Sequence, residues 1–197
     1  RHRPSVTNTI TAPFTLQITC NQTLATRTNI RVIGDFRTKD MVLGGQGAPL
    51  VPAFHQALFP KVDKDVFVVN IGGIANITFI PANKTQSVIG FDTGPGNALM
   101  DEWYKIHQNG RYDSEGNWAK SGTINNTLLA LLLDDCYFKK SAPKSTGREY
   151  FTLNWLRQNI AKLSSPTEFK PQDIKATLTA LTARSIINDI NKISTKN

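Results

Sequence analysis

Residues 66–80 constrain the fold more than any other part of this chain of 197 residues. Residues 66–70, Val-Phe-Val-Val-Asn, form a continuous β-branched and aromatic run, which predicts a strand buried on both faces. Gly72-Gly73 predicts a tight turn, and residues 74–80 alternate apolar with small or polar side chains, as a returning strand does. A third short strand is predicted over 87–91, ending at Asp92.

The rest of the chain favours helices, so the predicted fold class is α/β. A helix starting at about Asn97 would place Leu99, Trp103 and Ile106 on roughly one face. Further helices are predicted over 23–28, 51–59, 128–133, 151–163 and 171–193, and further strands over 12–18 and 30–33.

The last predicted helix is apolar on two sides. Its two faces, rotated by more than about 90° at ~100° per residue, consist of Ile174, Leu178 and Leu181 and of Ile186, Ile190 and Ile193. Such a helix needs two covering surfaces. We expect one of them to come from chain beyond Asn197, so that the sequence is an internal piece of a longer protein.

The composition excludes several classes of protein. Hydrophobic residues make up 40% of the chain and aromatic residues 9%, which argues against general disorder. No apolar run approaches the ~18 residues that span a bilayer, and no apolar signal core follows the basic N-terminus. We therefore expect a cytoplasmic protein with no membrane partner. Cys20 and Cys136 have no metal-ligand or disulfide spacing, which predicts reduced, partly buried thiols and no metal site.

The net charge of +8 raises the question of a nucleic-acid partner. The basic residues are spread along the chain, the longest Lys/Arg run is Lys139-Lys140, and no known reader motif accompanies them. A solvated basic surface is the favoured interpretation, and no nucleic-acid partner is expected. An anionic small substrate is compatible with the charge.

The Gly72-Gly73 turn is the first candidate site. Glycine lets a backbone approach a bulky anion, and successive N–H groups of such a turn can hold phosphate oxygens. Asn70 and Asn76 flank the turn and would add neutral donors. An ordinary hairpin is the alternative, and the pattern alone favours it.

The second candidate is Asp92, where a strand meets a glycine-rich loop that leads into a helix. Ligands of open α/β sheets bind at such positions, and the N–H groups of the helix start favour negative charge. A carboxylate there can act as a general base. A turn-capping role for Asp92 is the alternative, and Asp101 is a second carboxylate that suits the first helical turn.

The third candidate lies within residues 35–50. Arg37 could pair with a substrate carboxylate, and Asp35 or Asp40 could hold sugar hydroxyls, beside a flexible loop that contains Gly44 and Gly45. An Arg–Asp surface or hinge network is an equal alternative.

The fourth candidate, residues 143–149, combines small and basic residues that suit an anion. The stretch from Ser145 to Glu149 also suits a helix start, and this structural interpretation is preferred.

Together these segments resemble the family of anhydro-N-acetylmuramic acid kinases. The resemblance covers nearly the whole chain and rests on residues 35–55, 70–73, 90–101 and 144–149, in the order of the family. It implies an incomplete actin/hexokinase-like (ribonuclease H-like) sugar kinase fold, with a mixed sheet and flanking helices. Residues 1–65 would then be part of the N-terminal domain and sugar-side crossover, and residues 66–197 part of the C-terminal domain.

The resemblance also implies an activity. Such a kinase opens the 1,6-anhydro ring of anhydro-N-acetylmuramic acid and phosphorylates O6 with ATP and Mg²⁺, giving N-acetylmuramate 6-phosphate in cell-wall recycling. Asp92 would activate a water molecule for attack on C1 while O6 takes the γ-phosphate. Residues 70–76 would lie on the phosphate side and residues 35–47 toward the sugar, and the family suggests a homodimer.

The sequence departs from the family in several places. No counterpart of the family's Gly-Thr-Ser-x-Asp-Gly phosphate loop or of its Gly-Gly-Gly adenosine segment is found, so the chain alone is expected to be inactive. Thr19 and Asn29 stand at usual glycine positions, where strain in the turn is expected at Thr19. A non-catalytic muramyl-sugar-binding remnant is the alternative function, and ATP dependence would separate the two.

Overall fold

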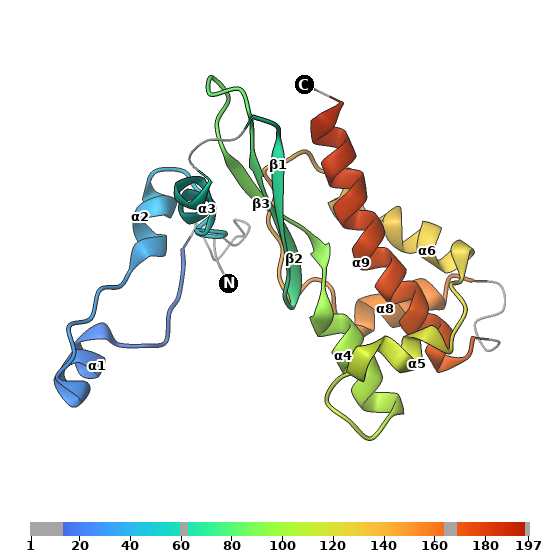
Figure 1. Ribbon diagram of the computed structural model, residues 1–197. Coiled ribbons are helices and arrows are strands. Elements are labelled where there is room, and N and C mark those ends of the chain that lie inside the picture. The colour runs from blue at the N-terminus through green and yellow to red at the C-terminus, as the bar shows by residue number, and fades with distance from the viewer. Residues whose placement is uncertain (1–13, 60–62, 164–168, 196–197) are drawn as a thin grey trace, which may run out of the picture.

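The computed structural model describes residues 14–59, 63–163 and 169–195. Its centre is an antiparallel sheet of three strands in the order β1-β2-β3 (Figure 1). The strands are β1 (Val66–Ile71), β2 (Ile74–Ile80) and β3 (Ile89–Pro95). The three predicted strands are confirmed. A mixed sheet was expected, but within the described ranges the strand pairs are all antiparallel.

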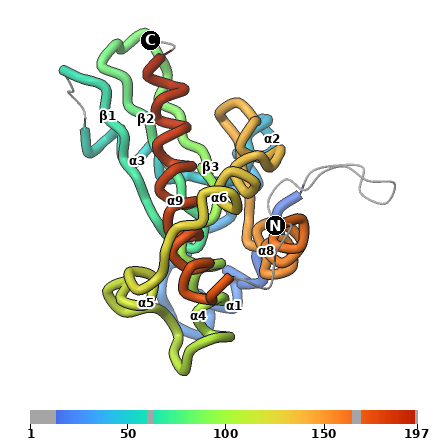
Figure 2. Tube along the Cα trace, turned by 90° about the vertical axis from the view of Figure 1, so that its right-hand side faces the viewer, coloured from blue at the N-terminus to red at the C-terminus, as the bar shows by residue number. Residues whose placement is uncertain are grey.

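One face of the sheet is covered by α9 (Pro171–Ser194), which crosses it in Figure 2. Ile186, Ile190 and Ile193 of α9 pack there against Ala75, Ile77 and Phe91. The second apolar face of the last helix is therefore covered by the sheet itself. The expectation that it needs chain beyond Asn197 is wrong, because the sequence pattern does not show which distant element supplies a surface.

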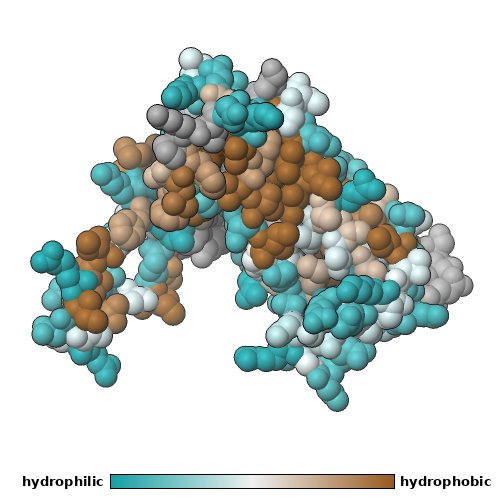
Figure 3. Space-filling model, in the orientation of Figure 1, coloured by the Kyte–Doolittle hydropathy of each residue, from teal (hydrophilic) through white to brown (hydrophobic). Residues whose placement is uncertain are grey.

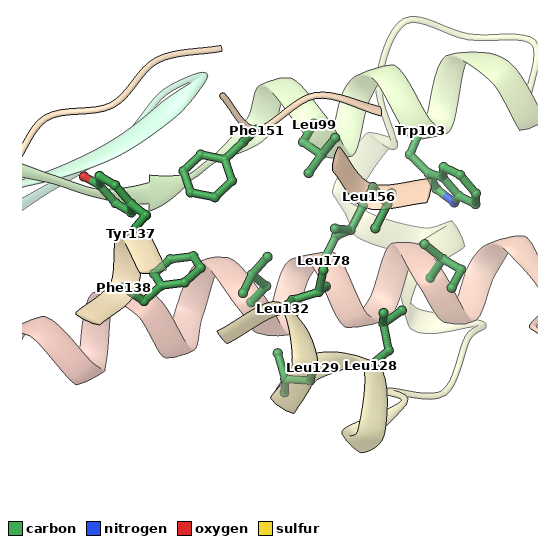
Figure 4. Packing of buried hydrophobic residues seen from close by; sticks show 12 residues of the cluster. Leu99, Trp103, Leu128, Leu129, Leu132, Tyr137, Phe138, Phe151, Leu156 and Leu178 are labelled. Carbon is green, nitrogen blue, oxygen red and sulfur yellow. The ribbon is translucent and has the colours of Figure 1, made fainter. Parts of the chain in front are cut away.

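The first face of α9 packs into a helical core beside the sheet (Figure 4). This core is built by α4 (Asn97–His107), α6 (Asn126–Leu133), α7 (Cys136–Lys139) and α8 (Leu153–Ile160), with η1 (Ser114–Gly116) and α5 (Asn117–Lys120) alongside. Leu128, Leu132 and Leu156 are fully buried in it. The predicted helices of this half are confirmed, although Ile106 remains 46% exposed at the end of α4.

β1 is less buried than its sequence predicts. Its residues are half-buried at the start of the strand and exposed at the end, with Val69 39% and Ile71 49% exposed. Figure 3 shows this apolar surface over β1. The prediction of a strand buried on both faces is thus wrong for the described residues, because β1 is an edge strand paired only with β2.

The other face of the sheet contacts the N-terminal part of the chain. This part holds α1 (Asn21–Thr28), α2 (Phe36–Val42) and α3 (Pro52–Leu58). His55 Nδ1 of α3 lies 2.9 Å from Thr78 Oγ1 of β2. The ring carbons of Pro49 and Pro52 lie so close to Gly90 that a side chain there would collide with Pro52.

The two strands predicted in this part are not formed. Within the described residues 14–18 only Thr15 makes an isolated bridge, and residues 12–13 lie outside the described ranges. Residues 30–33 are irregular, and Ile30 and Ile33 are 66% and 74% exposed. A β-branched run forms a strand only beside a partner strand, and residues 30–33 pair with no strand of the described ranges.

Asn29 explains one departure from the expected glycines. It ends α1 with φ 53°, in the left-handed region that asparagine tolerates better than most residues. Thr19 does not have a positive φ, so the strain expected there is absent. Both cysteines are free thiols, as predicted, but they are exposed and not partly buried.

Candidate active site

Asp92 lies inside β3, not at its end as predicted, and directly before a β-bulge. Asn76 of β2 pairs with Asp92 and Ala75 pairs with Gly94, so Thr93 is an extra residue without a partner on β2. The hydroxyl of Thr93 donates to the carbonyl of Ala75 at 3.2 Å. A bulge reverses which face the next residues present. Gly94 accordingly faces Phe138 and Ser185, while Gly90, before the bulge, faces Pro49 and Pro52.

The backbone of Asp92 is fixed from outside the sheet. Its N–H donates to the carbonyl of Lys144 at 2.9 Å, and its carbonyl accepts from the Tyr137 hydroxyl at 2.6 Å. Burial and the charges of Asp92 and Asp189 raise the pKa of Tyr137, so its hydroxyl remains a donor. Both backbone groups are therefore satisfied in an edge strand that would otherwise leave them unpaired.

The carboxylate of Asp92 is held by the same segment. Its Oδ2 accepts from Ser145 Oγ and from the N–H of Thr146, each at 3.0 Å. Its Oδ1 accepts no hydrogen bond from any described residue and is not sealed from solvent. Asp92 is only 7% exposed, and burial raises the pKa of its carboxyl, while the two hydrogen bonds offset part of the rise. Such a group has one anchored oxygen and one that is free to accept a proton.

Residues 144–146 of the fourth candidate segment contact Asp92 directly. The helix start preferred from the sequence is wrong, since residues 144–147 are irregular and extend beside β3. Ser145 and Thr146 lie in the fourth candidate segment, but the sequence did not predict that they hold Asp92. Small hydroxyl residues at an anion-compatible loop were the available signal, but only the fold shows that they meet Asp92.

Asn70, Asn76 and Asp92 form a row across the three strands. Asn70 pairs with Asn76, and Asn76 pairs with Asp92. Residues directly opposite in a sheet share a face, with Cβ atoms ~5 Å apart. Asn70 is exposed, Asn76 is half-buried and Asp92 is buried. The structure thus brings together the first two candidate sites, with a polar row that leads from solvent to the carboxylate.

The Gly72-Gly73 turn packs on the start of α4. The carbonyl of Gly72 accepts from the N–H of Asn97 at 2.7 Å, and the carbonyl of Gly73 accepts from Gly96 and Ala98 at 3.1 and 3.3 Å. An added Cβ at Gly96 would lie 2.2 Å from Gly72 O, so glycine is required for this contact. The first N–H groups of α4 are thus occupied by the turn. The expectation that they are open to an anion is wrong.

The turn itself keeps its own donors. Within the described ranges, the N–H groups of Gly72 and Gly73 donate to no acceptor. Both residues are half-buried at the end of the hairpin. Two successive free N–H groups are what a phosphate-binding turn offers.

The third candidate site forms a loop held by its own side chains. Arg37 Nη1 donates to the carbonyl of Gly47, and Asp40 Oδ2 accepts from the Gly47 N–H at 2.7 Å. Gly45 N–H donates to the Asp40 carbonyl at 2.8 Å, and Gly44 has φ +93°, which favours glycine. The structural alternative was an Arg–Asp surface or hinge network, whereas in these bonds Arg37 and Asp40 both hold the backbone of Gly47. Sugar binding by Arg37 and Asp40 stays a prediction.

Asp35 lies at the start of α2 and takes no part in the bonds from Arg37 and Asp40 to Gly45 and Gly47. It precedes α2 with φ 61°, and its carboxylate accepts from the Thr38 hydroxyl. The loop nevertheless lies on the Asp92 side of the sheet, because Pro49 and Pro52 contact Gly90, two residues before Asp92.

Asp101 lies apart from this site. It lines a cavity of about 780 Å³ between α4, α5 and α9, which is also lined by Lys175 but not by Asp92. Burial raises the pKa of Asp101, and the nearby charges of Lys175 and Arg148 counteract the rise. Asp92, held by several directed hydrogen bonds, is the better candidate for a reacting carboxylate.

Metal and membrane features are limited in the described parts. Residues 14–59, 63–163 and 169–195 contain no group of three His, Cys, Asp or Glu side chains placed to bind a metal ion. In those same ranges no helix has the length and apolar character needed to cross a bilayer.

Comparison with known proteins identifies relatives along the whole chain. The family model described as anhydro-N-acetylmuramic acid kinase matches residues 1–197. The anhydro-N-acetylmuramic acid kinase of Colwellia psychrerythraea is 55% identical over 201 residues, covering 96% of this chain and 50% of the relative. The same-named proteins of Haemophilus influenzae and Coxiella burnetii are 52% and 50% identical, over 93% and 95% of this chain and 49% and 48% of their own lengths.

The chain thus spans about half the length of the curated relatives it matches. The match includes every segment that forms the site around Asp92. The chain belongs to the anhydro-N-acetylmuramic acid kinase family.

Proposed function

We propose that this chain carries the catalytic carboxylate and part of the phosphate site of an ATP-dependent kinase that acts on anhydro-N-acetylmuramic acid. The observation that carries the proposal is the half-anchored carboxylate of Asp92, with one oxygen held by Ser145 and Thr146 and one left free. The names of the relatives support the substrate. The product would be N-acetylmuramate 6-phosphate, an intermediate of cell-wall recycling.

In this proposal Asp92 Oδ1 takes a proton from water, whose oxygen attacks C1 of the sugar. The C1–O6 bond breaks, O6 attacks the γ-phosphorus of ATP, and ADP leaves. A carboxyl whose pKa is raised by burial is a stronger base than an exposed aspartate. The fixed Oδ2 keeps the orientation of the carboxylate constant during the reaction.

The nucleotide phosphates would lie at the Gly72-Gly73 turn, where the two free N–H groups and Asn70 and Asn76 offer neutral donors. Mg²⁺ is commonly held by one or two carboxylates together with substrate phosphates. The free oxygen of Asp92 is assigned to the base, and no group of three metal-binding side chains lies in the described ranges, which fits a metal carried mainly by the nucleotide. When bound, the metal would neutralise phosphate charge.

Several further parts of the proposal rest on the family. An actin/hexokinase-like fold is proposed, with residues 1–65 assigned to the N-terminal domain and residues 66–197 to the C-terminal domain. The loop of Arg37, Asp40, Gly44 and Gly45, with Asp35, would face the sugar. A cytoplasmic location and a homodimer are proposed on the same basis.

The test uses a chimera, because the chain spans about half of its relatives. The 197 residues would replace the matching half of the Colwellia psychrerythraea kinase, and formation of sugar phosphate from anhydro-N-acetylmuramic acid, ATP and Mg²⁺ would be measured. We expect ATP-dependent turnover that Asp92→Asn removes while sugar binding persists. Asp101→Asn is the matched control and should keep most turnover. A well-folded chimera that binds the sugar equally with and without ATP, and forms no phosphate, would support the sugar-binding remnant instead.

A further inference from the structure

The segment 144–148 links the carboxylate to the hairpin turn. At its start, Lys144 Nζ lies 3.1 and 2.8 Å from the two carboxylate oxygens of Asp189 in α9, and both side chains are buried. In its middle, Ser145 and Thr146 hold Asp92. At its end, Arg148 reaches the Gly72-Gly73 turn. One short segment therefore touches both parts of the proposed site.

The position of Arg148 is fixed by its contact with Gly73. A Cβ added to Gly73 would lie 3.0 Å from Arg148 Nε and 3.4 Å from Arg148 Nη2. The guanidinium group thus packs against the backbone of the turn, which gives a reason for glycine at position 73. The guanidinium group lies against Gly73, one of the two turn residues whose N–H groups donate to no acceptor in the described ranges.

Arg148 has no competing partner within the described ranges. It is exposed, makes no hydrogen bond or ion pair there, and no acidic group lies within salt-bridge distance. Its charge acts on Asp101, where it counteracts part of the rise in pKa that burial causes. A guanidinium group beside a turn with two successive free N–H groups offers an anion both charge and several hydrogen-bond donors.

The donors at the turn suit a phosphoryl group, which presents several oxygens to them. Ser145, which holds Asp92, and Arg148, which contacts Gly73, are three residues apart in the same segment. A carboxylate ligand would gain from the arginine but would use the two N–H groups poorly.

We propose that Arg148 is a phosphate-binding residue, which together with the N–H groups of Gly72 and Gly73 holds a terminal phosphoryl group of ATP beside Asp92. This inference rests on the proposed function for the identity of the nucleotide, and it assigns a ligand role to one basic residue of the fourth candidate segment. The segment 144–148 then positions the base and the phosphate together.

The experiment measures binding of pyrophosphate to the 197-residue chain by ¹⁵N NMR, following the amide signals of Gly72 and Gly73. We expect both signals to shift with saturating behaviour. Arg148→Gln should weaken binding about ten-fold, because a charged hydrogen-bonding group is lost. Arg148→Lys should retain an intermediate affinity. Arg111→Gln is the matched control, since Arg111 is exposed and carries the same charge elsewhere.

Four results would overturn the inference. These are an absence of shifts at Gly72 and Gly73, unchanged affinity in Arg148→Gln, equal weakening in Arg111→Gln, and binding of acetate at the same site as strong as that of pyrophosphate. Thermal melting shows that each variant is folded. The titration needs no sugar and no turnover. If the chain binds pyrophosphate as expected but the chimera is inactive, the kinase proposal is refuted and the phosphate-binding role of Arg148 is not.

Discussion

Replacing Asp189 by asparagine tests whether a buried ion pair holds the segment that contacts Asp92. The side chains of Lys144 and Asp189 are 3% and 6% exposed, so solvent does not screen their contact at 2.8 Å. Asparagine keeps the shape and leaves the Lys144 ammonium group without its charge partner. Breaking a buried pair in this way typically costs about 3 to 5 kcal/mol. Lys192, whose ammonium also contacts Asp189, is half-exposed and adds little.

We expect Asp189→Asn to lower the free energy of unfolding by about 3 kcal/mol, the lower end of this range. The cost is limited because Lys144 can lose its proton and become neutral. For a chain of this size that loss corresponds to a fall in Tm of about 6 to 12 °C. Urea denaturation with an unchanged m value would measure the difference. Asp134→Asn is the matched control: the Lys139–Asp134 pair has the same 2.8 Å distance, but its side chains are 63% and 72% exposed. It should change stability by less than about 1 kcal/mol.

The pH dependence gives a second check. Burial lowers the pKa of Lys144 below the ordinary lysine value of 10.5, and contact with Asp189 offsets part of this effect. Without Asp189 the pKa of Lys144 in the folded state falls further. Between that pKa and the unfolded value, the unfolded chain binds more protons, so stability rises with pH. The deficit of Asp189→Asn should therefore shrink from pH 7 toward pH 10.

If Asp189→Asn lowered the free energy of unfolding by less than about 0.5 kcal/mol, no more than Asp134→Asn does, the reasoning would be refuted. The double variant Lys144→Met with Asp189→Leu should recover most of the stability, since a buried ion pair can often be replaced by apolar residues. In Asp189→Asn the pKa of Asp92, followed by ¹³C NMR, should rise as its bonds to Ser145 and Thr146 loosen.

Further predictions concern the site and the sheet. Asp92→Asn in the active chimera should reduce turnover by a factor of about 10² to 10⁴. Its Tm at pH 7, measured by differential scanning fluorimetry, should be unchanged or higher because a buried charge is removed. A large loss of Tm would contradict this expectation. The acid limb of the pH–rate profile should lie above the ordinary aspartate pKa of 3.8, and a limb at or below that value would argue against burial of Asp92 in the working enzyme. Gly96→Ala should destabilise the chain by about 1 to 3 kcal/mol in urea titrations, because its Cβ would meet Gly72 O at 2.2 Å, whereas Gly116→Ala, with open space around it, should cost only its backbone strain at φ +66°. Val69→Lys on the exposed edge strand should reduce self-association in light scattering, and unchanged scattering would show that this edge does not drive it.

The sequence predicted the local elements where one short pattern decides them. The hairpin of 66–80 and the helix from Asn97 depend on neighbouring residues, so alternation and helical spacing were sufficient. The same reasoning failed at 30–33, because a strand also needs a partner that a local pattern does not specify. Asp92 was found as a candidate because its type and its place near glycines are local features.

Tertiary structure decided how these pieces form a site. The sequence by itself determined the three strands, the main helices, the family motifs and the candidacy of Asp92. Only the fold placed Ser145 and Thr146 on the Asp92 carboxylate, more than 50 positions along the chain. The same holds for Arg148 at the Gly73 turn and for the sheet that covers the second face of α9. The physical reason is that burial, pKa and hydrogen-bond direction depend on neighbours in space, which a one-dimensional pattern does not contain.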